Sequence, residues 1–121
     1  MQMLSRNPAA AYRRVALDAR IEASGSGDLT RICLEEAQAA LAQAYGAVVR
    51  GSSAGREPLV RAQTIMVWLA RSVAPGHPLG PSLKAFYGGL AGQVGKQIQQ
   101  ADAQRLEEIR KDINDLLEAA S

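Results

Sequence analysis

Few side chains in this sequence have the type and spacing that catalysis or metal binding requires. The sequence contains one histidine, His77, which lies in a Pro- and Gly-rich stretch between Pro75 and Pro78. A metal site inside a helical bundle would need inward-facing Glu and His side chains, in the di-iron case as Glu-x-x-His pairs. A phosphotransfer histidine would have to be exposed on a helix. We therefore predict no metal, no cofactor and no phosphotransfer site.

Two further motifs resemble catalytic ones only in part. Cys33 is the single cysteine and falls on an apolar stripe, where a thiol acts as a small hydrophobic side chain. The Gly95-Lys96 pair resembles the end of a phosphate-binding P-loop, but Leu90 replaces its first glycine and Gln97 its final Ser or Thr. We therefore predict that the chain is not an enzyme.

The composition predicts helices as the framework that carries these residues. The chain has 121 residues, of which 47% are hydrophobic and 21% charged, as in an ordinary globular domain. Ala, Leu, Gln, Glu and Arg dominate, and all of them favour helices. We expect a single all-α domain.

Residues 1–27 are predicted to form a short N-terminal helical arm with a flexible connector, and residues 28–121 the bundle. Asn7-Pro8 has the residue types of a helix N-cap followed by proline at the first helical position. An amphipathic stretch follows from Ala9 to Ala23, and Ser24-Gly25-Ser26-Gly27 ends it.

The bundle is predicted from four segments whose apolar residues recur at three- and four-residue spacing, as in helices with one buried face. We expect helices over Asp28–Val49, from Pro58 to about Val73, over Leu83–Ile98 and from near Asp102 onwards, with Pro75–Pro81 as a loop. Four helices of similar length with short connections pack as an antiparallel up-down four-helix bundle.

The side chains predicted to face the core lie on the apolar stripe of each segment. They are Leu29, Ile32, Cys33, Ala37, Leu41, Ala44, Val48, Ala62, Ile65, Met66, Leu69, Val73, Leu83, Phe86, Tyr87, Leu90, Val94, Ile98, Leu106, Ile109, Ile113, Leu116, Leu117 and Ala120. Val67 and Trp68 widen the apolar arc of the second helix, so we expect that helix to be covered on more than one side.

Three glycines, Gly88, Gly92 and Gly95, share one face of the third helix, although each costs about 1 kcal/mol relative to alanine. Such a strip permits close approach by a neighbouring helix or an extended peptide, or makes the helix easy to deform. Tight packing inside the bundle is the alternative.

Charge is unevenly distributed, although the formal net charge is only +2. Residues 38–101 contain six basic residues and one acid, Glu57, whereas the residues from Asp102 onwards contain six acids and three basic residues. We interpret this as pairing between neighbouring helices; an acidic partner is the alternative. We predict a cytoplasmic protein, because the sequence has a single cysteine and no secretory-signal pattern. We also predict no membrane insertion, because the longest apolar run, Ile65–Ala70, is too short to span a bilayer.

The order of these parts resembles the flagellar secretion chaperone family. The matching residues are Ala11-Tyr12-Arg13-Arg14-Val15 in the arm, Asp28 to Ala37 and Leu41 to Ala44 in the first long helix, and Leu83-Lys84-Ala85-Phe86-Tyr87 in the third. The junction Gln99-Gln100-Ala101-Asp102 leads into Leu106, Ile109 and Ile113, as in the last helices of that family. The resemblance covers about residues 8 to 119.

This resemblance implies a cytosolic export chaperone in which the N-terminal arm covers an apolar groove of the bundle. The disordered C-terminal region of newly made flagellin would displace the arm and be kept from polymerising before secretion. The implied client-binding residues are Tyr12, Val15, Leu29, Ile32, Leu83, Tyr87, Leu90 and Val94. Permanent burial in the core is the alternative for these residues, and it is the stronger one for Leu29 and Leu90.

Two other interpretations stay open at this point. In the first interpretation, the chain is a regulatory or adaptor bundle. It binds another protein or forms a weak homodimer through the apolar arc around Val67 and Trp68. In the second, the basic middle helices bind nucleic acid, which would give an affinity that falls steeply with salt. We expect no nucleic-acid partner.

Overall fold

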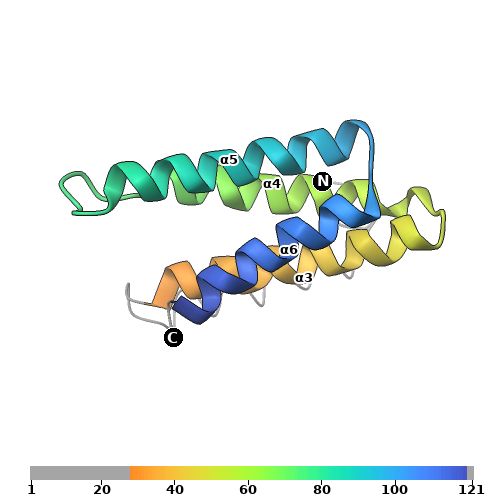
Figure 1. Ribbon diagram of the computed structural model, residues 1–121, viewed down its shortest axis with the longest axis horizontal. Coiled ribbons are helices and arrows are strands. Elements are labelled where there is room, and N and C mark those ends of the chain that lie inside the picture. Colours follow the sequence, from red (N-terminus) through yellow and green to blue (C-terminus); the bar gives the residue numbers. More distant parts are fainter. Residues whose placement is uncertain (1–27, 120–121) are drawn as a thin grey trace, which may run out of the picture. The chain divides into compact units, whose positions relative to one another are not determined.

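The computed structural model describes residues 28–119, which form four α-helices and one short 3-10 helix joined by loops (Figure 1). Their order is α3 (Leu29–Val49), η2 (Ser53–Gly55), α4 (Arg56–Arg71), α5 (Gly80–Gln99) and α6 (Ala103–Ala119). Within this range no residue lies in a β-strand. The all-α helical bundle is therefore confirmed, whereas the up-down order of all four helices stays a prediction.

The chain divides into two compact units, Met1–Ile32 and Cys33–Ser121. The second unit contains most of α3 and all of α4, α5 and α6. The predicted N-terminal arm lies outside the described residues, and with it Tyr12 and Val15; so does Ala120.

The end of α3 at Val49 agrees with the prediction and is closed by backbone hydrogen bonds. The amide of Gly51 donates to the carbonyl of Val48 at 3.0 Å, and the amide of Ser52 donates to that of Ala47 at 2.8 Å. This pairing is a Schellman motif, which satisfies carbonyl groups that a helix end leaves free. Gly51 has a φ of 71°, a left-handed conformation that glycine adopts without a steric penalty.

The second predicted helix begins earlier than expected. α4 starts at Arg56, two positions before Pro58, so the prediction that Pro58 opens it is wrong. Pro58 lies instead in the first turn, where backbone N–H groups have no intrahelical acceptor and a proline therefore costs no hydrogen bond. The preceding turn, η2, is capped by Ser52, whose Oγ accepts from the amide of Ala54 at 3.0 Å.

The loop predicted over Pro75–Pro81 is also shorter than expected, because α5 begins at Gly80. Pro81 takes the second helical position, where its missing N–H is again harmless. The start of the last helix near Asp102 is confirmed. Oδ1 of Asp102 accepts from the amide of Gln104 at 3.0 Å and lies 3.5 Å from that of Arg105, as an N-cap does.

α4 and α5 form an antiparallel pair joined by the loop between Arg71 and Gly80 (Figure 1). At the loop end, a Cβ placed on Gly80 would lie 3.5 Å from a methyl of Val73. Farther along, Nε2 of Gln63 donates to the carbonyl of Ala91 at 3.3 Å. These two contacts fix the register of the pair and put Gly88 at about the level of Met66 and Val67.

The core combines large side chains from all four helices. The most completely buried are Leu34, Leu41, Met66, Leu90, Val94, Leu106, Ile109 and Ile113. Full burial of a side chain of this size stabilises a fold by about 1.5–3 kcal/mol. Alanines at 37, 40, 44 and 47 are buried too, so α3 presents a narrow face against which neighbouring helices can approach closely.

Two sequence predictions about burial are wrong. Phe86 was expected in the core, but 41% of its surface is exposed. It lies one position, or about 100° around the helix, from Tyr87, which takes the buried place instead. Trp68 is 44% exposed, so the outer face of α4 is not covered on a second side by the described residues.

Candidate functional site

The client-binding residues predicted on α5 form one stripe, and the structure buries most of it. Tyr87, Leu90 and Val94 are 6%, 1% and 0% exposed, and Leu83 at the start of the stripe is half-buried. Burial raises the pKa of the Tyr87 phenol above its ordinary value. A client could contact these side chains only after the core beside α5 has opened.

The two predicted residues on α3 lie in its first turn. Leu29 is half-buried and Ile32 is buried. Both belong to the compact unit that ends at Ile32, whereas the α5 stripe belongs to the second unit. The structure therefore describes these two groups of residues separately.

The outer face of α4 carries an open pocket of about 270 Å³. Gln63, Thr64, Val67, Trp68 and Arg71 line it. Its apolar lining comes mainly from Val67, which is half-buried, and from the exposed ring of Trp68. An aromatic side chain beside a hollow of this kind is typical of protein–protein contact sites.

The three glycines of the α5 strip and the adjacent Gly89 fall into two groups. A Cβ on Gly88, Gly89 or Gly92 would meet no atom within 4 Å, whereas one on Gly95 would lie 2.7 Å from Nε2 of Gln63. Internal packing therefore accounts for Gly95 alone. The other three glycines are exposed, and they leave a low, smooth surface along the outer side of α5.

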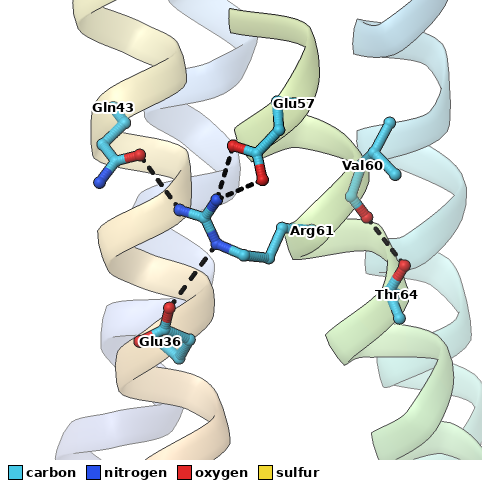
Figure 2. Close-up of polar contacts among 6 residues, drawn as sticks. All are labelled: Glu36, Gln43, Glu57, Val60, Arg61 and Thr64. Carbon is cyan, nitrogen blue, oxygen red and sulfur yellow. Dashed lines mark hydrogen bonds and ion pairs between the residues drawn. The ribbon is translucent and has the colours of Figure 1, made fainter. Parts of the chain in front are cut away.

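Arg61 is the most strongly coordinated charged side chain in the described part of the chain (Figure 2). Its Nη1 donates to both carboxylate oxygens of Glu57 at 2.7 and 2.8 Å, and its Nη2 donates to Oε1 of Gln43 at 3.1 Å. Its Nε lies 3.6 Å from a carboxylate oxygen of Glu36. Because these acceptors surround the guanidinium, Arg61 joins α4 to α3 and is not available to bind an anion.

A second polar contact joins α3 to α6. Nε2 of Gln38 donates to the carbonyl of Arg110 at 3.0 Å, and the Arg110 guanidinium lies 5.7 Å from the ring centre of Tyr45. A cation over an aromatic ring at this distance is attracted by the ring's negative face. Together with Arg61, these residues fix α3 between its neighbours.

The predicted pairing of the basic middle with the acidic last segment is not found. Within the described residues, the acids of α6 pair with bases of the same helix: Glu107 with Arg110 at 2.6 Å, Glu108 with Arg105 at 3.6 Å, and Asp115 with Lys111 at 3.4 Å. Partners three or four positions apart are adjacent on a helix, so these local pairs form first. The cations Arg71, Lys84 and Lys96 form no ion pair with any described residue.

Neither Cys33 nor His77 has the surroundings of a reactive group. Burial, and to a smaller extent the nearby carboxylate of Glu36, raises the pKa of the buried Cys33 thiol. Nδ1 of His77 accepts from the amide of Leu79 at 3.0 Å, which stabilises the loop before α5. Among the described residues, no three His, Cys, Asp or Glu side chains are grouped closely enough to hold a metal ion.

Sequence reasoning missed the structural roles of Arg61 and Gln97. The spacing of Glu57 and Arg61 could have revealed their pair, but nothing in the sequence identifies Gln43 and Glu36 on another helix as further partners of Arg61. Gln97 was noted only as a mismatch to a P-loop, yet it is buried, and its Oε1 accepts from the amide of Asp102 at 2.7 Å. It thereby holds the α5–α6 connection.

Comparison with known proteins identifies no family for this chain, so a proposal about its function depends on the residues described above. No family model matches the chain, and no curated protein matches it. Across residues 28–119, no helix combines the length and the apolar character needed to cross a membrane.

Proposed function

We propose that this chain is a non-enzymatic, client-binding helical bundle that holds the C-terminal segment of flagellin before export. What supports the proposal is the resemblance of residues 8 to 119 to the flagellar secretion chaperones, and the all-α fold of the described residues. The observation that carries it is the α5 stripe of Leu83, Tyr87, Leu90 and Val94, whose spacing suits an amphipathic client helix.

The buried state of this stripe is compatible with the proposal because the glycines of α5 lower the cost of opening that helix. Besides Gly80 at its first position, α5 has glycines at positions 88, 89, 92 and 95 in its interior, and each of these four lowers helix stability by about 1 kcal/mol relative to alanine. Three of them pack against no side chain. A client that replaces the covering of Tyr87 and Leu90 with its own apolar residues would offset the cost of opening.

Co-elution with flagellin tests this function directly. The purified full chain is mixed with full-length flagellin and, as the control client, with flagellin that lacks its C-terminal segment. We expect a 1:1 complex with the first and none with the second. Absence of a complex with both proteins, or equal binding of both, contradicts the proposal.

A conservative substitution locates the contact. Tyr87→Phe keeps the ring in the core and removes only the hydroxyl, and Tyr45→Phe is the matched control on α3. We expect Tyr87→Phe to weaken flagellin binding several-fold, because a tyrosine at the edge of an apolar contact usually hydrogen-bonds to its partner. Equal affinities of the two variants would remove Tyr87 from the site.

A regulatory or adaptor bundle is the second candidate function, favoured by the exposed Trp68 beside the α4 pocket. An adaptor would bind a folded partner or a second copy of itself, whereas a flagellin chaperone is expected to be monomeric alone. Sedimentation of the free protein over a range of concentrations distinguishes the two.

A further inference from the structure

The outer face of α4 combines an apolar pocket with a positive charge that no residue in the described part of the chain neutralises. Val67 and Trp68 provide the apolar lining, and Arg71 lies at one end of the pocket. The register of the hairpin, set by the Gly80–Val73 and Gln63–Ala91 contacts, puts Lys84 of α5 at about the level of Arg71 along the helix pair. Both cations are exposed, and neither forms an ion pair with a described residue.

No acid of the hairpin compensates these cations. α5 contains no Asp or Glu, and the one acid of α4, Glu57, is held by Arg61. A partner that matches this surface must therefore present apolar side chains together with negative charge.

The exposed glycines of α5, the helix paired with α4, admit a second backbone at close range. The register puts Gly88 at about the level of Met66 and Val67, and a Cβ at Gly88 or Gly92 would meet nothing within 4 Å. A helix resting there could approach α5 without clashing with side chains. These glycines set the distance of approach, while the pocket and the cations determine the partner.

Two other occupants fit less well. In a two-fold dimer each copy presents the same patch, so Arg71 and Lys84 of one copy would face those of the other without an acid between them. Nucleic acid requires a row of cations along the backbone, but Arg71 is the single cation that lines this hollow beside valine and tryptophan.

We propose that the pocket on the outer face of α4 binds an acidic amphipathic helix of a partner protein. Its apolar side chains occupy the pocket beside Trp68, and its carboxylates contact Arg71 and Lys84. This surface does not include the buried Tyr87, Leu90 and Val94 stripe, so it goes beyond the proposed function and can be tested separately from it.

Trp68 provides the readout, because it is the only tryptophan in the chain and lines the pocket. The probe is a synthetic helical peptide of about 20 residues, long enough to populate a helix in solution, with leucines at i, i+3, i+4 and i+7 and glutamates beside them. The control peptide has lysine at every glutamate position. We expect a saturable blue shift of Trp68 emission with the acidic peptide and none with the basic one.

Two pairs of variants of the full chain localise the contact. Gly88→Leu places a side chain on the open surface of α5 at about the level of Val67, and Gly89→Leu makes the same change about 100° farther around the helix. We expect the first variant to weaken binding at least about tenfold and the second less than about twofold. The double variant Arg71→Glu, Lys84→Glu should abolish binding of the acidic peptide. Lys96→Glu, the charge control on α5, should retain it.

Three results overturn the proposal. The first is no saturable shift with the acidic peptide, or an equal loss of binding in Gly88→Leu and Gly89→Leu. The second is a concentration-dependent blue shift of the free protein together with a dimer in sedimentation, which assigns the pocket to a second copy. The third is tighter binding of a single-stranded oligonucleotide with steep salt dependence, which assigns it to nucleic acid. Flagellin co-elution does not bear on any of them.

Discussion

Arg61 shows how much of the bundle depends on one side chain that the sequence pattern did not single out. Its guanidinium donates to Glu57 and Gln43 and lies 3.6 Å from a carboxylate oxygen of Glu36, and its side chain is only 17% exposed. The two hydrogen bonds that Nη1 donates to the Glu57 carboxylate fix the side chain within α4. That fixed side chain then holds two acceptors of α3 in place (Figure 2).

Replacing Arg61 should therefore destabilise the fold more than removing another cation of the same helix. We expect Arg61→Ala to lower the free energy of unfolding by about 1–3 kcal/mol, since Glu36 and Glu57 would lose their counter-charge in a partly buried site. Arg71→Ala is the control, with an expected change within about 0.5 kcal/mol. Urea denaturation of the three proteins checks the difference, and equal losses would reduce Arg61 to a surface charge.

Cys33 leads to a prediction about pH. Burial raises the pKa of its thiol above the ordinary value of 9.0, so the folded state holds this proton more tightly than the unfolded state does. The stabilisation is complete at pH values below 9.0 and is lost as the pH rises through the folded pKa. Cys33→Ala should remove part of the decline in unfolding free energy between pH 8 and pH 10.5, as measured by urea denaturation. Burial also raises the pKa of Tyr87, so part of the decline in unfolding free energy should remain in the Cys33→Ala variant. An identical decline in both proteins would show that the thiolate costs nothing in the folded state.

At the scale of elements, helix periodicity was enough to predict four helices, and the end of α3 at Val49 and the start of α6 near Asp102 agree with the predicted bounds. The starts of α4 and α5 did not, because a proline is compatible with any position of the first turn and so marks a start only approximately. The exposure of Phe86 was missed because two aromatic residues in succession cannot both face one core, and periodicity did not decide between Phe86 and Tyr87. The α4 pocket and the triple coordination of Arg61 depend on neighbours from other turns and helices, which no single helical pattern contains.

The glycines of α5 allow a paired test of packing. Gly92→Ala adds a methyl in open space, so we expect a gain of about 0.5–1 kcal/mol in unfolding free energy from helix propensity. Gly95→Ala adds the same methyl 2.7 Å from the present position of the Gln63 amide, which must move and give up its hydrogen bond to Ala91. We expect this variant to gain less than Gly92→Ala or to lose stability. Thermal denaturation of both checks the order, and a larger gain for Gly95→Ala would contradict the packing described above.

At the scale of the whole molecule, the helices of the second unit are not held equally. α3 contributes buried residues from Ile32 to Ala47 and is joined by hydrogen bonds or ion pairs to α4 and to α6. α5 is attached through its apolar stripe and through the amides of Gln63 and Gln97, and its outer side contributes no packing at Gly88, Gly89 and Gly92. Stability should therefore decrease from α3 to α5.

This gradient predicts that α5 opens in a step separate from global unfolding. Native-state hydrogen exchange should give the amides around Gly88 to Gly92 a lower opening free energy than those around Leu41 in α3, because an opening of α5 leaves the α3 contacts to α4 and α6 intact. Gly92→Ala should raise the opening free energy of α5 by about 0.5–1 kcal/mol, and if the client must open this helix, the same variant should bind flagellin less tightly by a similar free energy. Exchange of α3 and α5 at one common free energy would mean that the Tyr87, Leu90 and Val94 stripe is uncovered only by complete unfolding. A client site on that stripe would then be excluded, while the pocket on the outer face of α4 would be unaffected, since it is open without any conformational change.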